Sequence, residues 1–152
     1  FDRKDKEFAN KIRSTLTETD ILDSFQRIGI KAPFDMPLCD FVAPLNNFSS
    51  GGIGSTDVGD VSWVVPTVQA RVATCAVGTP FHTWQTVAQG KAPAAHKGMV
   101  HAAKIMASTA CALINDPKKL NEAKEAFKIQ IKKNPYVCPI PDGVMPPIVK
   151  YE

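Results

Sequence analysis

The 152-residue sequence lacks the features that mark membrane and nucleic-acid-binding proteins. No run reaches the ~18–20 apolar residues of a membrane-spanning helix, and the N-terminus has no apolar signal core. Aromatic residues make up only 8% of the sequence. The lysines of 118–133 are not interleaved with the set of aromatic residues on which a single-stranded nucleic acid would stack its bases; Phe127, the one aromatic residue among them, is on the apolar face of the predicted helix. The net charge is a modest +3. We therefore expect no membrane partner and no nucleic-acid partner.

Cysteine is also scarce and widely spaced. Cys39, Cys75, Cys111 and Cys138 form no CxxC pair, which argues against a zinc ribbon or a thioredoxin motif. Cys75 and Cys111 lie in apolar surroundings, so we expect both to be small buried residues with free thiols. Free thiols are typical of a reducing compartment, and the expected location is the cytoplasm.

Helical periodicity recurs along most of the chain. Phe8, Ile12 and Leu16 repeat at the spacing of one helical face, with Asp2 placed to cap that helix. Asp116 and Pro117 form a second start signal, an N-cap followed by proline at the first helical position. The expected helices span residues 2–16, 20–28, about 95–114 and 117–133. The third is apolar nearly all round, which is typical of a helix buried against a sheet.

A short strand region is predicted between these helices. Residues 46–60 hold four of the nine glycines and are expected to form a loop. The β-branched residues that follow predict strands over about 61–78, the best of them from Gln69 to Val77.

The C-terminal residues 134–152 contain five of the twelve prolines, so we expect an extended tail. A single strand cannot pair its own backbone groups, so it needs a sheet supplied from elsewhere. Because the chain also begins at Phe1 rather than Met, we expect it to be a segment of a longer protein.

Several polar residues could carry chemistry. Asp57 and Asp60 are two carboxylates in a glycine-rich loop, a pattern that fits cation binding or an ordinary turn. The Gly51–Gly59 loop is also compatible with anion binding. His82 follows the best strand, where ligands of α/β proteins gather, although a lone His is often only hydrogen-bonded. His96, near a helix start, fits a capping role or a site role.

Four runs of sequence resemble one enzyme family in their order and spacing. They are GSTDVGDVSWVVPT at 54–67, GTPFHTWQ at 78–85, AHKGM at 95–99 and CPIP at 138–141. Together they resemble the zinc metallopeptidase/aminoacylase-type amidohydrolases, in particular the aminobenzoyl-glutamate hydrolases, over roughly residues 5–148. The resemblance implies an α/β fold: the C-terminal part of a three-layer α/β/α catalytic domain, without the lid domain.

The resemblance also implies a set of site residues. His82 matches the last metal-binding His of the family, which uses two divalent ions, Zn or Mn. Asp57 matches an acidic motif position, with Thr56 and Val58 in place of the motif's Glu and Phe. Thr67 replaces a Gly beside the substrate cleft. The residues expected beside the substrate or the metal are Asp57, Asp60, Thr67 and His96.

The implied reaction is hydrolysis of the amide bond of a small molecule, an N-acyl or aminobenzoyl amino acid such as aminobenzoyl-glutamate. The catalytic Glu and the other metal ligands would lie outside this chain, so the isolated chain is expected to be inactive. Its expected partner is the missing N-terminal part or a second copy, as a homo-oligomer. An alternative is a non-catalytic interaction module that pairs through an open sheet edge.

Overall fold

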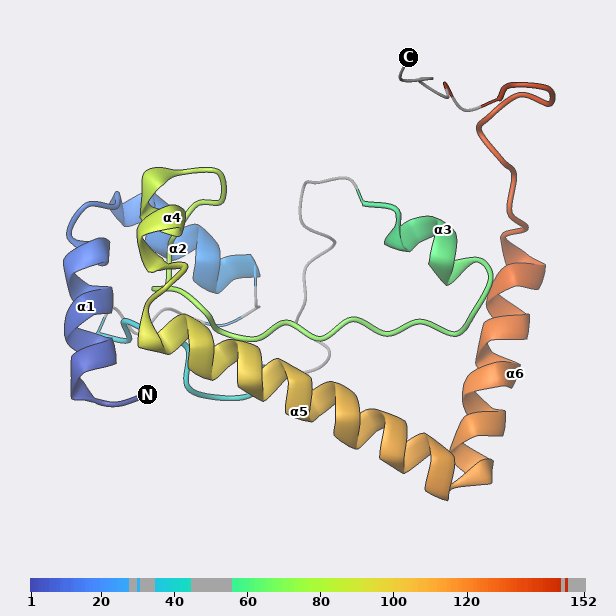
Figure 1. The fold of residues 1–152 in the computed structure, drawn as a ribbon, viewed down its shortest axis with the longest axis horizontal. Coiled ribbons are helices and arrows are strands. Elements are labelled where there is room, and N and C mark those ends of the chain that lie inside the picture. Colours follow the sequence, from blue (N-terminus) through green and yellow to red (C-terminus); the bar gives the residue numbers. More distant parts are fainter. Residues whose placement is uncertain (28–29, 31–34, 45–55, 146, 148–152) are drawn as a thin grey trace, which may run out of the picture. The chain divides into compact units, whose positions relative to one another are not determined.

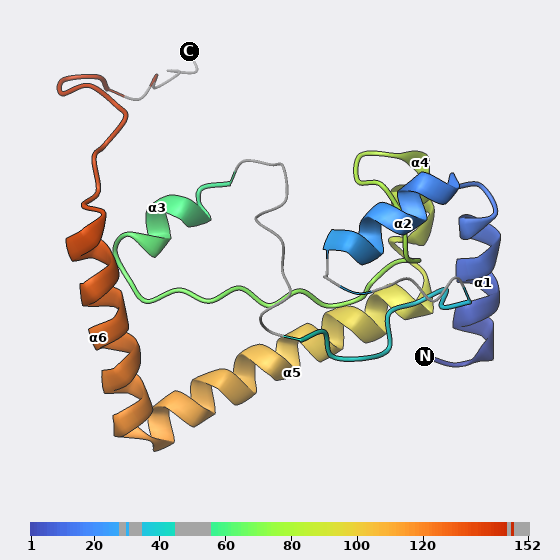
Figure 2. The ribbon, with the colours of Figure 1, turned by 180° about the vertical axis from the view of Figure 1, so that it is seen from behind.

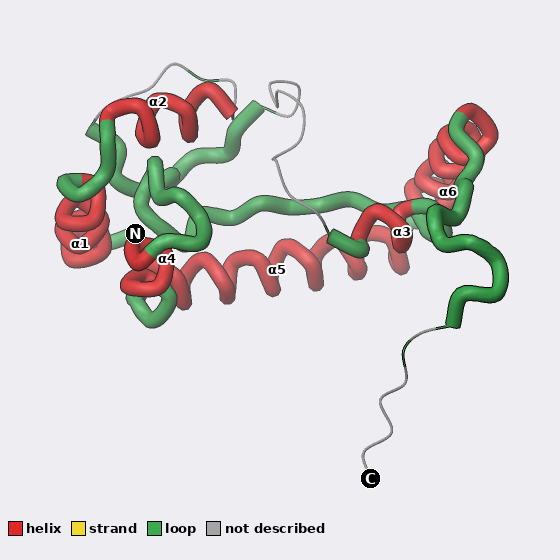
Figure 3. The backbone as a smooth tube through the Cα atoms, turned by 90° about the horizontal axis from the view of Figure 1, so that it is seen from above, coloured by secondary structure: helices red, strands yellow, loops and turns green. Residues whose placement is uncertain are grey.

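The computed structural model describes residues 1–27, 30, 35–44, 56–145 and 147. Within these residues all regular secondary structure is helical, and no strand forms (Figure 3). The helices are α1 (Arg3–Arg13), α2 (Glu18–Arg27), α3 (Val58–Ser62), α4 (Trp84–Gln89), α5 (Pro93–Asn115) and α6 (Pro117–Lys133).

The expected α/β class is therefore wrong. Of the strand region predicted at about 61–78, the first residues belong to α3, and residues 66–74 have no regular structure. Their β-branched sequence favours extended backbone, but a strand forms only where a second strand pairs with it. The described residues contain no such pair, and so they offer neither the three-layer sheet nor the open sheet edge of the alternative interpretation.

Helix starts, in contrast, follow the local sequence closely. The Asp2 carboxylate accepts the Asp5 N–H at 3.0 Å, and the Asp5 carboxylate accepts the Asp2 N–H at 2.8 Å. This reciprocal capping box satisfies two backbone donors at the start of α1. Asp116 likewise accepts the N–H groups of the two lysines after Pro117. The N-caps predicted at Asp2 and Asp116 are confirmed.

The chain divides into two compact units. The first contains the described residues up to 44 together with Gln69–Ala112, and the second contains Thr56–Val68 and the described residues from Leu113 onward. In the first unit, α1, α2 and α4 gather near the start of α5 (Figures 1 and 2). The largest fully buried side chains there are Phe25 and Leu38. A small buried cluster consists of Ala9, Ile12, Leu38, Ala76 and Ala94.

Helix α5 meets the rest of the first unit closely at its first turns. A Cβ on Gly98 would collide with the carbonyl oxygen of Ala73 and lie 2.8 Å from Cγ2 of Thr74, so the backbones meet closely here. Figure 1 shows this segment running beside α5. Only Ala94 and Gly98 of the helix are buried. No helix among the described residues has the length and hydropathy to cross a membrane.

The expectation that α5 is buried on most sides is thus wrong. Met106 is 71% exposed and Ile114 is 77% exposed, because no sheet covers the helix in the described part of the chain. The expected burial of Cys111 fails for the same reason, since it lies on this helix and is exposed. Cys75 is partly buried, and all four cysteines are free thiols.

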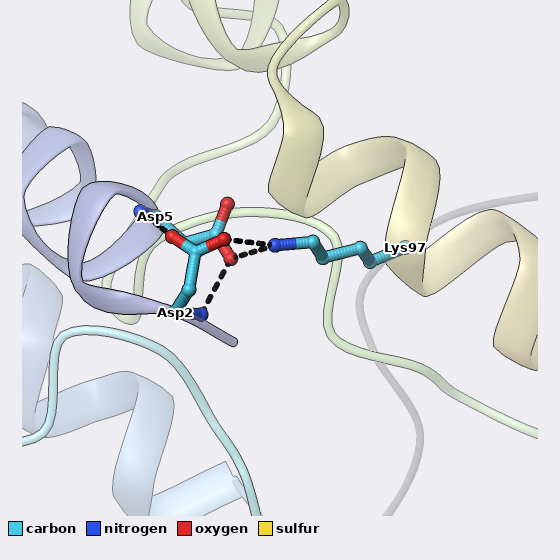
Figure 4. Close-up of polar contacts among 3 residues, drawn as sticks. All are labelled: Asp2, Asp5 and Lys97. Atoms are coloured by element: carbon cyan, nitrogen blue, oxygen red, sulfur yellow. Dashed lines mark hydrogen bonds and ion pairs between the residues drawn. The ribbon is translucent and has the colours of Figure 1, made fainter.

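An ion-pair cluster joins α1 to α5 (Figure 4). The Lys97 ammonium lies 2.7 Å from Oδ2 of Asp2 and 2.5 Å from Oδ2 of Asp5. The Asp5 side chain is only 1% exposed, so Lys97 supplies the countercharge of a buried carboxylate. Its hydrogen bonds lower the pKa of Asp5 and lower that of Asp2 to about 2.

Replacing Gly98 with alanine should destabilise the first unit. The new methyl group would collide with the Ala73 carbonyl group, and such overpacking costs about 1–3 kcal/mol of unfolding free energy. Urea denaturation followed by circular dichroism measures the loss. Gly59→Ala is the matched control, because a Cβ there meets nothing within 4 Å. Equal stability of Gly98→Ala and the wild type would refute the close contact.

Acid should weaken the link between α1 and α5. The pKa values of Asp2 and Asp5 in the folded chain lie below the ordinary 3.8. The stability that their ionised carboxylates give the folded chain is therefore fully present above pH 3.8. It is lost as the pH falls from 3.8 towards about 2. Lys97→Met should therefore lower stability near neutral pH and flatten this acid dependence in urea denaturation. Lys104→Met, the control, should show the same dependence of unfolding free energy on pH as the wild type. If Lys97→Met lost stability on acidification as steeply as the wild type, the ion pairs of Lys97 would not be the cause.

Candidate functional site

His82 lies in the turn that precedes α4. Its backbone φ is 64°, and its imidazole side chain is exposed. This left-handed conformation is uncommon for residues other than glycine, although His adopts it more often than most. Such backbone strain persists only where neighbouring groups fix the chain. The turn therefore presents His82 to solvent in a conformation that its surroundings must maintain.

The side chain of Gln89, 3% exposed, ties this turn to α4. Its Oε1 accepts the backbone N–H of Ala76 at 2.7 Å. Its Nε2 donates to Oγ1 of Thr79 at 3.0 Å and to the carbonyl oxygen of Gln85 at 3.0 Å. Both donors and one acceptor site of a buried amide are thereby satisfied, and the chain before His82 is held in place.

Threonine hydroxyl groups fix the turn from the other side. Those of Thr83 and Thr86 donate to the carbonyl oxygen of Pro80 at 2.8 Å and 2.7 Å. Thr83 is also the N-cap of α4, where its side chain accepts the Thr86 N–H. His82 thus lies between two anchored residues, Pro80 and Thr83.

The other predicted site residues fall in both units. His96 is exposed on the first turn of α5, in the unit that contains His82. Asp57, Asp60 and Thr67 belong to the second unit. Asp57 precedes α3 without capping it through its side chain, and the Thr67 hydroxyl donates to the carbonyl oxygen of Val65. Residues 51–55 of the proposed anion loop lie outside the described residues.

The residues described do not form a metal centre by themselves. No group of three or more His, Cys, Asp or Glu side chains lies close enough to hold an ion anywhere in this part of the chain. A catalytic zinc ion takes about three protein ligands. His82 can therefore supply at most one ligand of the expected two-metal site.

The second unit contains an aromatic pair that the sequence pattern did not indicate. The rings of Trp63 and Tyr136 lie 6.0 Å apart at 45°. The Tyr136 hydroxyl donates to Oδ1 of Asp60, 76 residues earlier, at 3.1 Å. This bond raises the pKa of Tyr136 to about 12. Asp60, predicted beside a substrate, thus positions an aromatic ring.

An open groove of about 410 Å³ lies beside this pair, and we call it the aromatic groove. Its lining residues are Trp63, Lys128, Ile131, Lys132, Pro135 and Tyr136. The VSWVVP run contains Trp63, but nothing in the sequence indicates its pairing with Tyr136.

Comparison with known proteins shows similarity to a hydrolase subunit. The chain is 39% identical, over 153 aligned positions and 94% of its length, to the B subunit of the p-aminobenzoyl-glutamate hydrolase of Escherichia coli (strain K12). The resemblance is confirmed. The chain spans 32% of the length of that relative. No family model matches the chain, and no solved structure matches it.

The strain at His82 can be measured by substitution with glycine. His82→Gly should leave the free energy of unfolding unchanged or raise it by up to about 1 kcal/mol, because glycine adopts a positive φ without steric cost. His101→Gly, an exposed site within α5, should lower it by about 1 kcal/mol. Chemical denaturation of both variants provides the comparison. A greater loss in His82→Gly than in His101→Gly would show that the turn is unstrained.

Proposed function

We propose that this chain is one segment of a metal-dependent hydrolase that cleaves the amide bond of an aminobenzoyl amino acid such as aminobenzoyl-glutamate. The observation that carries the proposal is the 39% identity to a hydrolase subunit across 94% of this chain. Because the chain corresponds to 32% of that relative, the activity would belong to a longer protein. The name of the relative supports an assembly with a further subunit.

Within that protein, His82 is the residue of this chain that we assign to metal binding. Three features support this role: an exposed imidazole, a turn fixed by buried and half-buried hydrogen bonds, and a left-handed backbone conformation. A neutral imidazole is the commonest metal ligand in proteins. Bound divalent ions, Zn or Mn, would polarise the amide carbonyl group.

The remaining parts of the site would come from elsewhere. The described residues lack a cluster of ligands, so under this proposal the other ligands and the general base would come from the rest of the longer protein. Asp57, Asp60, Thr67 and His96 are the proposed contributors to the surroundings of the substrate.

A chimera with the relative tests this assignment. The matched region of the Escherichia coli protein is replaced with this chain, and hydrolysis of p-aminobenzoyl-glutamate is measured with the full assembly. His82→Ala should reduce the rate by more than about 100-fold, beyond the roughly 10–100-fold typical of residues that only support a ligand. His101→Ala, which removes an exposed imidazole from α5, should retain the rate of the chimera.

The 152-residue chain alone provides the second control. We expect no hydrolysis and only weak zinc binding in calorimetric titration, because a single imidazole cannot hold the ion tightly. Tight stoichiometric zinc binding by the isolated chain would refute the idea that the other ligands lie outside it. An active chimera that carries His82→Ala would refute the role of His82.

A further inference from the structure

The aromatic groove of the second unit has a lining that the proposed hydrolysis does not use. We propose that it binds a small aromatic carboxylate, a single aryl ring with one acid group. The groove combines aromatic and apolar side chains with two lysine side chains. The proposal rests on these residues alone, so a test of it does not depend on the proposed hydrolase function.

The aromatic part of the lining suits a flat ring. Trp63 and Tyr136 are at a separation typical of paired aromatic rings, and Tyr136 remains 46% exposed. Ile131 and Pro135 add apolar surface beside them. A planar aryl group can therefore contact a ring face and bury apolar area at once, whereas a strongly hydrated ligand would gain little from this surface.

The size of the groove limits the ligand. Pockets for small molecules span about 300–1,000 Å³, and the aromatic groove, at about 410 Å³, is near the lower end. This volume has room for one substituted ring.

The charge of the lining selects an anion. Lys128 and Lys132 are four residues apart on α6, so they lie on one face of the helix. Lys128 is paired with Glu125 at 2.7 Å, which offsets its charge. Lys132 takes part in no ion pair among the described residues, so its ammonium group is available to a carboxylate. Asp60, the nearby acid, is bonded to the Tyr136 hydroxyl.

A titration of the full chain with benzoate tests the proposal. The chain has two tryptophans, so Trp84→Phe assigns the two indole N–H signals in a ¹H–¹⁵N spectrum. Benzoate should shift the Trp63 signal saturably and leave that of Trp84 in place. Lys132→Gln should weaken binding by about tenfold, the scale of one charge-assisted hydrogen bond. The spectrum of this variant without benzoate shows whether it is folded.

Matched controls separate charge from simple apolar contact. Lys124→Gln alters the same helix outside the groove lining and should bind benzoate as the wild type does. Benzamide keeps the ring without the charge, and cyclohexanecarboxylate keeps the charge without the aromatic ring; each should bind more weakly. The proposal is overturned by the lack of a saturable Trp63 shift in the millimolar range. It is equally overturned if benzamide binds as tightly as benzoate, or if Lys124→Gln and Lys132→Gln weaken binding equally.

Discussion

The arrangement around His82 depends on one buried amide. The Gln89 side chain bonds to the backbone N–H of Ala76, to the Thr79 hydroxyl and to its own helix through the Gln85 carbonyl oxygen. A buried N–H left without a partner costs about 1–3 kcal/mol, so the Gln89 acceptor stabilises Ala76 in its position by an energy of that order. The path of the chain towards His82 is thereby set by a residue on the helix that follows it.

Two other contacts join α5 to the rest of the first unit, and they are of different kinds. Gly98 lets α5 approach the Ala73 backbone, and Lys97 neutralises the buried Asp5 carboxylate on α1. Steric fit and charge thus act at adjacent residues on one helix. The second unit contains no buried residue among those described, and its distinct contacts are the Trp63–Tyr136 pair and the bond from Tyr136 to Asp60. Few buried contacts imply low local stability, so this unit should open more easily than the first.

The sequence predicted the features that depend on near neighbours. The capping signals at Asp2 and Asp116 gave the helix starts, because an N-cap bonds to residues two or three positions away. The strands at 61–78 were wrong because β-branched residues specify an extended backbone but not the second strand that it needs. Likewise, Gln89 and Tyr136 could not be found from the sequence: the first bonds 13 residues back, and the second bonds to Asp60 across 76 residues.

The same distinction applies to the site. The exposure of His82 follows from local sequence, because the Gly-Thr-Pro run before it indicates a turn, and side chains in turns are commonly exposed. A hydrolytic metal centre depends on long-range contacts, because its ligands come from segments that are far apart in the sequence. The described residues contain an exposed imidazole at His82 in a turn fixed by hydrogen bonds, but no cluster of metal ligands. Under the proposed role of His82, the fixed geometry of its turn would have a physical rationale: a ligand that is ordered before a metal binds loses less conformational entropy when the rest of the site assembles around it.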